Sequence, residues 1–237
     1  MPLANTYAVI PAAGTGSRMG AKTKKQYLQL DGWPVLAHTL KIFEKSPTIS
    51  GVVLVVGEQE VEWCRQQIVE RYGFNKVLVV VPGGNHRQHS VYNGLLALAA
   101  QDEDIVMVHD GARPLITEEI LSKAAEAALD KAAVVVAVPA KDTIKVIDGQ
   151  SRVVSTPPRE RLWQVQTPQV FNYRLLLRAY QHAKENDFLG TDDASLVEYL
   201  GHSVYIVPGN YENIKITTPE DMLLAESILQ RRREQCE

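Results

Sequence analysis

Glycines and basic residues gather near the start of the chain, directly after an apolar run. Gly14, Gly16 and Gly20 lie in a segment that also contains Arg18, and Lys25 follows shortly afterwards. Glycines let backbone N–H groups approach a ligand closely, and successive N–H groups form a concave nest that favours phosphate oxygens. An arginine can bind two such oxygens at once, and a lysine adds a compact positive charge. The pattern predicts a site for a polyphosphate such as a nucleotide.

The spacing of the glycines excludes the two commonest nucleotide loops. A P-loop has four residues between its first glycine and Gly-Lys-Ser/Thr, but counting on from Gly14 or Gly16 leads to Met19 or Ala21. A dinucleotide fingerprint reads Gly-x-Gly-x-x-Gly, and here the third glycine falls one residue late, at Gly20. Taken alone, the segment could also be a tight turn with surface charges, since glycine-rich turns are common after strands.

Length and composition narrow the class of protein. The 237 residues suit one α/β domain over 1–237, and a formal charge of −3 argues against a nucleic-acid partner. Cys64 and Cys236 are too far apart for a metal site and suggest a reducing compartment. No secretory signal and no apolar run of membrane-spanning length are visible. We therefore expect a cytoplasmic protein that does not bind membranes.

Short apolar runs alternate with helical patterns, which predicts a Rossmann-like, mainly parallel sheet with helices on both faces. The expected strands are Tyr7–Pro11, Val52–Val56, Val77–Val81, Ile105–Val108, Ala133–Val138, Val170–Phe171, Val204–Val207 and Ile214–Ile216. The expected helices are Pro34–Glu44, Gln59–Tyr72, Arg87–Ala100, one that starts at Thr117, Tyr173–Glu185, Asp192–Leu200 and Pro219 to about Arg233.

Three polar motifs follow strands of this predicted sheet. The glycine segment follows the first strand, Pro82-Gly83-Gly84 the third, and His109-Asp110 the fourth. Because parallel sheets bind ligands at the carboxyl ends of their strands, these motifs are expected at one edge.

The alternation breaks over residues 140–160. Two short β-like runs, Thr143–Ile147 and Val153–Thr156, flank Asp148-Gly149, which is a hairpin signal. An isolated two-stranded ribbon is marginally stable, so this arm is expected to project from the sheet and pack on a partner subunit.

Six motifs in this order resemble the cytidylyltransferases of isoprenoid precursor synthesis, across essentially the whole chain. They are Pro11-Ala-Ala-Gly-Thr-Gly-Ser-Arg-Met19, Lys25-Gln-Tyr27, His109-Asp-Gly-Ala-Arg-Pro114, Gln166-Thr-Pro-Gln-Val-Phe171, Thr191-Asp-Asp-Ala194 and Asn213-Ile-Lys-Ile-Thr-Thr-Pro-Glu-Asp221. One departure is Lys24, where the family usually has proline.

The resemblance implies that CTP and 2-C-methyl-D-erythritol 4-phosphate give CDP-methylerythritol and pyrophosphate, with Mg²⁺ as the divalent cation. It implies that Arg18, Lys25 and Lys215, the last on the strand Ile214–Ile216, are catalytic. Asp110 would bind Mg²⁺ or orient the substrate. Arg113 is expected to brace its loop, and His109 to be a packed residue rather than a catalyst.

The resemblance also implies two sets of binding residues and a homodimer formed through the arm. CTP would contact Ala12, Ala13, Gly14, Gly16, Gly84 and Ser90. The sugar phosphate would contact Asp110, Thr143, Arg159, Thr167, Thr191 and Glu212, of which Thr143 and Arg159 reach the neighbouring subunit's site. The family carries aspartate where Glu212 stands.

Three alternatives stay open at this point. A ribitol-5-phosphate cytidylyltransferase would use the same catalytic set, so only its substrate differs. A non-catalytic nucleotide-binding module could keep the glycine segment, although Arg18, Lys25, Asp110 and Lys215 together argue against it. A nicotinamide-dependent oxidoreductase is disfavoured by the glycine spacing.

Overall fold

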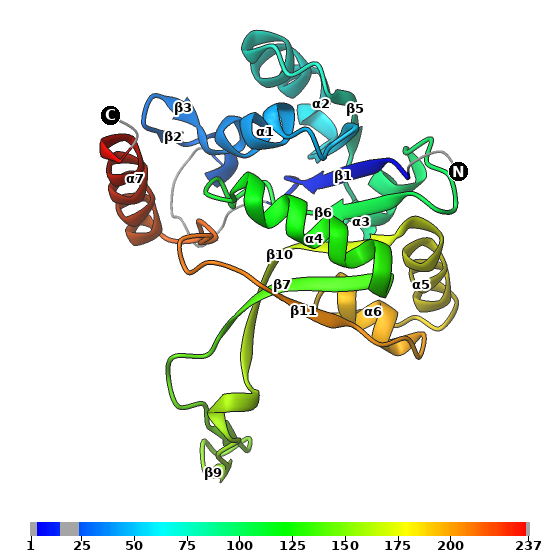
Figure 1. Ribbon diagram of the computed structural model, residues 1–237, viewed down its shortest axis with the longest axis vertical. Helices are drawn as coiled ribbons and strands as arrows, with labels where there is room; N and C mark the ends of the chain where they lie inside the picture. Colours follow the sequence, from blue (N-terminus) through cyan, green and yellow to red (C-terminus); the bar gives the residue numbers. More distant parts are fainter. Residues whose placement is uncertain (1–3, 15–23, 236–237) are drawn as a thin grey trace.

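The computed structural model describes residues 4–14 and 24–235. A seven-stranded sheet lies at its centre, in the order β11-β7-β10-β6-β1-β4-β5 (Figure 1). Every strand except β10 runs in one direction, and β10 is antiparallel to both of its neighbours. The strands are β1 (Thr6–Pro11), β4 (Gly51–Val56), β5 (Val77–Pro82), β6 (Ile105–Val108), β7 (Ala133–Pro139), β10 (Trp163–Asn172) and β11 (Tyr205–Pro208).

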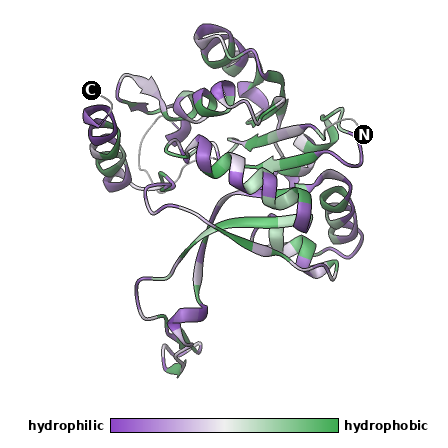
Figure 2. Ribbon diagram, viewed as in Figure 1, coloured by the Kyte–Doolittle hydropathy of each residue, from purple (hydrophilic) through white to green (hydrophobic). Residues whose placement is uncertain are grey.

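Helices cover both faces of the sheet, as the sequence predicts. On one face, α1 (Val35–Lys45), α2 (Val61–Cys64, continued by a π-helical segment, Arg65–Glu70) and α4 (Glu118–Lys131) bury residues such as Phe43 and Leu121. On the other, α3 (Arg87–Leu96), α5 (Tyr173–Glu185) and α6 (Asp193–Tyr199) bury residues such as Leu95 and Leu176. β4 and β6 are apolar along their length, as expected for parallel strands buried on both sides, whereas the first half of β10 contains polar residues (Figure 2).

A third, smaller apolar cluster lies beside the sheet. The C-terminal helix α7 (Pro219–Glu234) packs there with the short ribbon of β2 (Gln29–Leu30) and β3 (Trp33–Pro34). Ile216 is fully buried in this cluster, together with Leu30 and Ala225. The burial of Ile216 fixes the chain on the C-terminal side of Lys215.

A hairpin projects away from the sheet, as Figure 1 shows. Its strands, β8 (Val146–Ile147) and β9 (Val153–Ser155), are antiparallel and shorter than predicted. The Asp148 carboxylate closes the turn by accepting hydrogen bonds from the backbone N–H groups of Gln150 and Arg152, at 2.9 and 3.0 Å.

Several predicted boundaries are wrong. Ile214–Ile216 is not a strand; Ile216 instead donates its N–H to the Ala112 carbonyl in the loop after β6, at 2.8 Å. α3 ends at Leu96 rather than Ala100, because the N–H of Ala97 closes the last turn onto the carbonyls of Asn93 and Gly94. β10 extends well beyond Val170–Phe171, since its polar first half pairs with β7.

No helix of the described residues is long and apolar enough to cross a membrane.

Candidate active site

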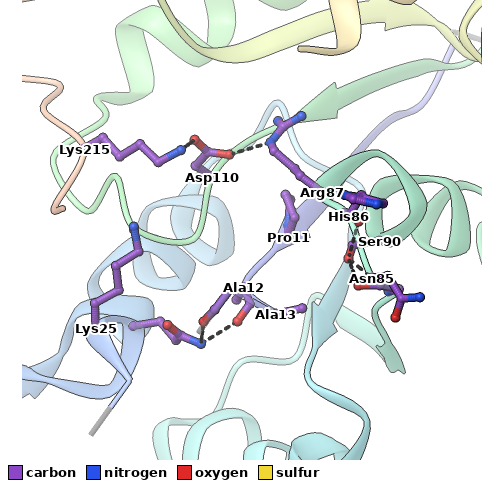
Figure 3. A pocket seen from close by; sticks show the side chains of 14 residues that line it. Pro11, Ala12, Ala13, Lys25, Asn85, His86, Arg87, Ser90, Asp110 and Lys215 are labelled. Atoms are coloured by element: carbon purple, nitrogen blue, oxygen red, sulfur yellow. Dashed lines mark hydrogen bonds and ion pairs between the residues drawn. The ribbon is translucent and has the colours of Figure 1, made fainter. Parts of the chain in front are cut away.

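A cavity of about 510 Å³ opens at the carboxyl ends of β1, β5 and β6 (Figure 3). This is the sheet edge at which the sequence predicts that the three polar motifs meet. The cavity is lined by Pro11, Ala12, Ala13, Gly14, Lys25, Gln26, Gly84, Asn85, His86, Arg87, Ser90, Asp110, Ala112 and Lys215.

Gln26 fastens the loop after β1 to the turn that carries Lys25. Its buried side chain donates from Nε2 to the carbonyls of Ala12, at 2.6 Å, and Gly14, at 3.1 Å. The turn is a short 3-10 helix, Lys25–Tyr27. Figure 3 shows the Lys25 ammonium pointing into the cavity, toward the side that holds Asp110 and Lys215.

The loops after β1 and β5 touch because Gly83 has no side chain. A Cβ there would lie 2.6 Å from Ala13 Cβ and 2.7 Å from Ser90 Oγ. Ser90 Oγ accepts a hydrogen bond from the Gly84 N–H, at 3.1 Å, and donates to the His86 carbonyl, at 3.2 Å. Ser90 therefore shapes the loop around Gly84 with its own side chain.

Four charged side chains of alternating sign run from the interior to the cavity. Lys215 Nζ lies 2.6 Å from Asp110 Oδ2, and Arg87 Nε donates to Asp110 Oδ1 at 3.1 Å (Figure 3). The two terminal nitrogens of Arg87 bind both oxygens of Asp193, at 2.9 and 2.8 Å. Asp193 is fully buried and also accepts from the Tyr180 hydroxyl. This bidentate anchor fixes the arginine.

Asp110 is ionised in this setting. Burial alone would raise the pKa of its carboxyl, but the charges of Arg87, Lys215 and Arg113 outweigh burial and hold the pKa well below its usual range. The carboxylate therefore stays negative at neutral pH and attracts Lys215.

The segment that carries Lys215 is held on both sides. Arg113 donates from Nη1 to the Asn213 carbonyl at 2.7 Å and so links the loop after β6 to this segment. The buried Asn213 side chain donates to the Thr167 carbonyl at 2.8 Å. Ile216 also donates its N–H to the Ala112 carbonyl. Together these contacts place Lys215 over Asp110, although its segment forms no strand.

His109 is buried and neutral. Its Nε2 lies 3.1 Å from the Arg113 carbonyl, which can only accept, so that nitrogen carries the proton. Nδ1 then accepts from the Thr167 hydroxyl at 3.1 Å, and Thr167 Oγ1 accepts from the Asp110 N–H at 3.1 Å. Burial lowers the pKa of His109 to about 4. His109 and Thr167 therefore support the backbone of Asp110.

The structure brings together eight of the residues that the sequence singled out, which all line the cavity. They are Ala12, Ala13, Gly14, Lys25, Gly84, Ser90, Asp110 and Lys215. Gly16 and Arg18 lie outside the described residues.

The other predicted substrate contacts lie away from the cavity lining. Thr143 and Arg159 are exposed near the hairpin, and Thr191 is exposed before α6. The Glu212 carboxylate pairs with Arg231 and Arg232 of α7. Thr167 lies beneath Asp110.

Sequence reasoning missed Gln26, Arg87, Asp193 and Asn213, although three of them lie within motifs already noted. Arg87 follows the Pro82-Gly83-Gly84 turn at the start of α3, so its position at the sheet edge was the available signal.

No group of three or more metal-ligating side chains occurs among residues 4–14 and 24–235. A Mg²⁺ site needs fewer, because this ion is commonly held by one or two carboxylates together with substrate phosphates. The Asp110 carboxylate accepts from Arg87 and Lys215, whereas a carboxylate offers about four lone-pair sites. Asp110 therefore fits the part of a single protein ligand to Mg²⁺.

Comparison with known proteins gives a consistent result. A family model described as 2-C-methyl-D-erythritol 4-phosphate cytidylyltransferase matches residues 6–231. Relatives of that name from Desulforamulus reducens and Geotalea uraniireducens are 52% and 53% identical, covering 99% and 94% of this chain and 100% and 95% of theirs. The crystal structure of 4-diphosphocytidyl-2C-methyl-D-erythritol synthase from Anaerococcus prevotii matches with a TM-score of 0.84 at 35% identity, covering 96% of this chain and 99% of that one.

We predict that His109 makes the folded protein less stable as the pH is lowered from about 6.5 to about 4. Between these values the unfolded chain binds a proton that folded His109 does not, so acid favours unfolding by up to about 3 kcal/mol. Urea unfolding across this pH range measures the effect. A His109→Gln variant should show a correspondingly shallower dependence, and a variant of the exposed His202 should keep the full one. An unchanged slope in His109→Gln would refute the assignment.

Proposed function

This chain belongs to the 2-C-methyl-D-erythritol 4-phosphate cytidylyltransferase family, and we propose that it joins CTP to methylerythritol phosphate, releasing pyrophosphate. The observation that carries this proposal is the cavity at the sheet edge, where Lys25 and Lys215 project from separate segments of the chain. The free Cys64 thiol suits a reducing compartment, which supports a cytoplasmic location.

The reaction is a substitution at the α-phosphorus of CTP. A phosphate oxygen of methylerythritol phosphate forms the new P–O bond, the bond between the α-phosphorus and the bridging oxygen breaks, and pyrophosphate leaves with that electron pair. A phosphate monoester has a second pKa near ~6, so the attacking oxygen needs no base at neutral pH. A neutral, buried His109 suits this chemistry.

Positive charge is what the reaction requires, because a dianion must approach a triphosphate. Lys25 would neutralise the triphosphate together with Arg18, which lies outside the described residues. Lys215 would contact the α-phosphate and the attacking phosphate. Since Lys215 is paired with Asp110, the incoming phosphates would draw it from a carboxylate that keeps its ion pair with Arg87.

Asp110 would hold Mg²⁺ through the lone pairs that Arg87 and Lys215 leave open. A Mg²⁺ ion held there would supply positive charge against the phosphates of CTP.

The cytosine would lie between the loops after β1 and β5, against Ala12, Ala13, Gly84 and Ser90, with Gly14 nearer the phosphates. Gly16, the other predicted CTP contact, lies outside the described residues. The close approach of Gly83 to Ala13 narrows this space and favours a pyrimidine over a purine.

The chain would act as a homodimer whose hairpins complete the neighbouring sites. Apolar side chains such as Ile147 and Val154, 56% and 61% exposed, would be covered by the partner. Thr143 and Arg159 lie beside this hairpin and outside the cavity of their own subunit. Thr167, Thr191 and Glu212 would bind the sugar phosphate from the subunit that holds the cavity. The Glu212 carboxylate would first have to break its ion pairs with Arg231 and Arg232.

Pyrophosphate release with CTP, Mg²⁺ and methylerythritol phosphate tests the activity. We expect turnover with this substrate and little with ribitol 5-phosphate. Lys25→Ala and Lys215→Ala should each lower kcat by about a hundredfold or more, because each removes a cation from the developing charge.

Turnover with ribitol 5-phosphate alone would support the same mechanism but would show that the proposed substrate is wrong. CTP binding with no release from either substrate would instead indicate a nucleotide-binding module. The exposed Lys123, paired with Glu119 on α4, supplies a control variant, since Lys123→Ala should leave turnover unchanged.

Mixing two inactive variants tests the shared site. In a Lys25→Ala and Arg159→Ala heterodimer, one of the two sites has both residues intact. Random pairing of equal amounts makes half of the dimers mixed, so about one quarter of the wild-type activity should return. Co-expressing the two chains ensures exchange, and no recovery in verified heterodimers would contradict sharing.

A further inference from the structure

Lys24 stands immediately before the turn that carries Lys25. Its backbone is extended, with φ −61° and ψ 140°, and the 3-10 helix Lys25–Tyr27 begins directly after it. The direction in which Lys25 enters the cavity therefore depends on how Lys24 is held.

An ion pair holds the Lys24 side chain. Its Nζ lies 2.9 Å from Glu60 Oε1, with the two side chains 33% and 19% exposed. The other oxygen of Glu60 accepts from the Gly57 N–H at 3.1 Å, in the connection between β4 and α2. Glu60 is thus fixed by backbone and offers Lys24 a stationary partner.

The residues that follow Lys25 are also held. Gln26 binds the loop after β1, and the Tyr27 ring packs edge-on against Trp63, with centroids 4.7 Å apart. Lys24 and Tyr27 both contact the helical turns after β4, through Glu60 and Trp63, and Gln26 contacts the loop after β1. Lys25 points into the cavity. The Lys24–Glu60 ion pair holds the chain on the N-terminal side of Lys25.

We propose that the Lys24–Glu60 ion pair is a positioning contact for Lys25, and that Lys24 itself does not bind substrate. The inference rests on the proposed function, because it assigns a role relative to Lys25. A partly exposed ion pair has a small energetic effect, so we expect its loss to lower kcat by about two- to fivefold.

The backbone of Lys24 supplies a sharp control. Proline fixes φ near the value that Lys24 already has. Lys24→Pro removes the ion pair but restrains the same backbone, so it should recover most of the activity that Lys24→Ala loses. Glu60→Gln keeps an acceptor for the Gly57 N–H and removes only the charge.

The test is kcat and KM, for CTP and for methylerythritol phosphate, in Lys24→Ala, Glu60→Gln, the double variant and Lys24→Pro. We expect Lys24→Ala and Glu60→Gln to lower kcat by the same factor, about two- to fivefold, which matches the small energy of a partly exposed ion pair. The double variant should lose no more than either, since both remove one contact. Arg65→Ala, which breaks the exposed pairs of Arg65 with Glu62 and Glu70 in the adjoining helix, should change nothing.

Direct phosphate binding by Lys24 predicts a different pattern and would overturn the proposal. Lys24→Ala and Lys24→Pro would then both raise KM for CTP, whereas Glu60→Gln would not. Additive losses in the double variant would overturn it too. Failure of the proposed function itself would show separately, as wild-type protein without pyrophosphate release or a Lys25→Ala variant with full activity.

Discussion

The site depends on one buried carboxylate held between two cations. Asp110 is ionised because Arg87 and Lys215 lie against its two oxygens, and their charges outweigh the cost of its burial. Arg87 is fixed by Asp193 in the interior, whereas Lys215 lies at the cavity. The two contacts are therefore unequal: Arg87 is anchored in the interior, whereas in the proposed reaction Lys215 would move from Asp110 to an incoming phosphate. Pairing with Asp110 would then hold the Lys215 cation at the cavity until the phosphates arrive.

The fold places these groups through elements that are far apart in the sequence. β6 delivers Asp110 to the sheet edge, α3 begins with Arg87, and α6 begins with Asp193. The β10 ladder shifts register between Val165 and Gln169, and there Thr167 reaches the backbone of Asp110. The Asn213–Ile216 segment is held by Arg113, Thr167 and Ala112 rather than by a neighbouring strand. Packing around the carboxylate thus joins five segments into one site.

Sequence reasoning found the parts of the site that follow directly from strand ends. The apolar runs predict the parallel strands, and parallel strands bring the loops at Gly14, Gly84 and Asp110 to one edge. It failed where contacts between distant segments decide the structure. Lys215 lies in a segment with strand-like residues, but the contacts of Ile216 and Asn213 override that propensity. The Arg87–Asp193 pair joins residues 106 apart, which no local pattern reveals. The predicted contacts at Thr143 and Arg159 require a second subunit and stay predictions.

The most direct test is to measure the affinity for CTP, without divalent cations, of the wild type and of Asp110→Asn. It shows whether Lys215 moves from the Asp110 carboxylate to a phosphate of CTP. Asparagine keeps the size and a carbonyl acceptor for Arg87 but removes the charge that competes with phosphate. We expect the variant to bind CTP about three- to tenfold more tightly, equivalent to roughly 1 kcal/mol, with its thermal unfolding confirming a folded protein. Unchanged or weaker binding in a folded Asp110→Asn protein would contradict this expectation, because it would show that the Asp110 carboxylate does not compete with the phosphates for Lys215.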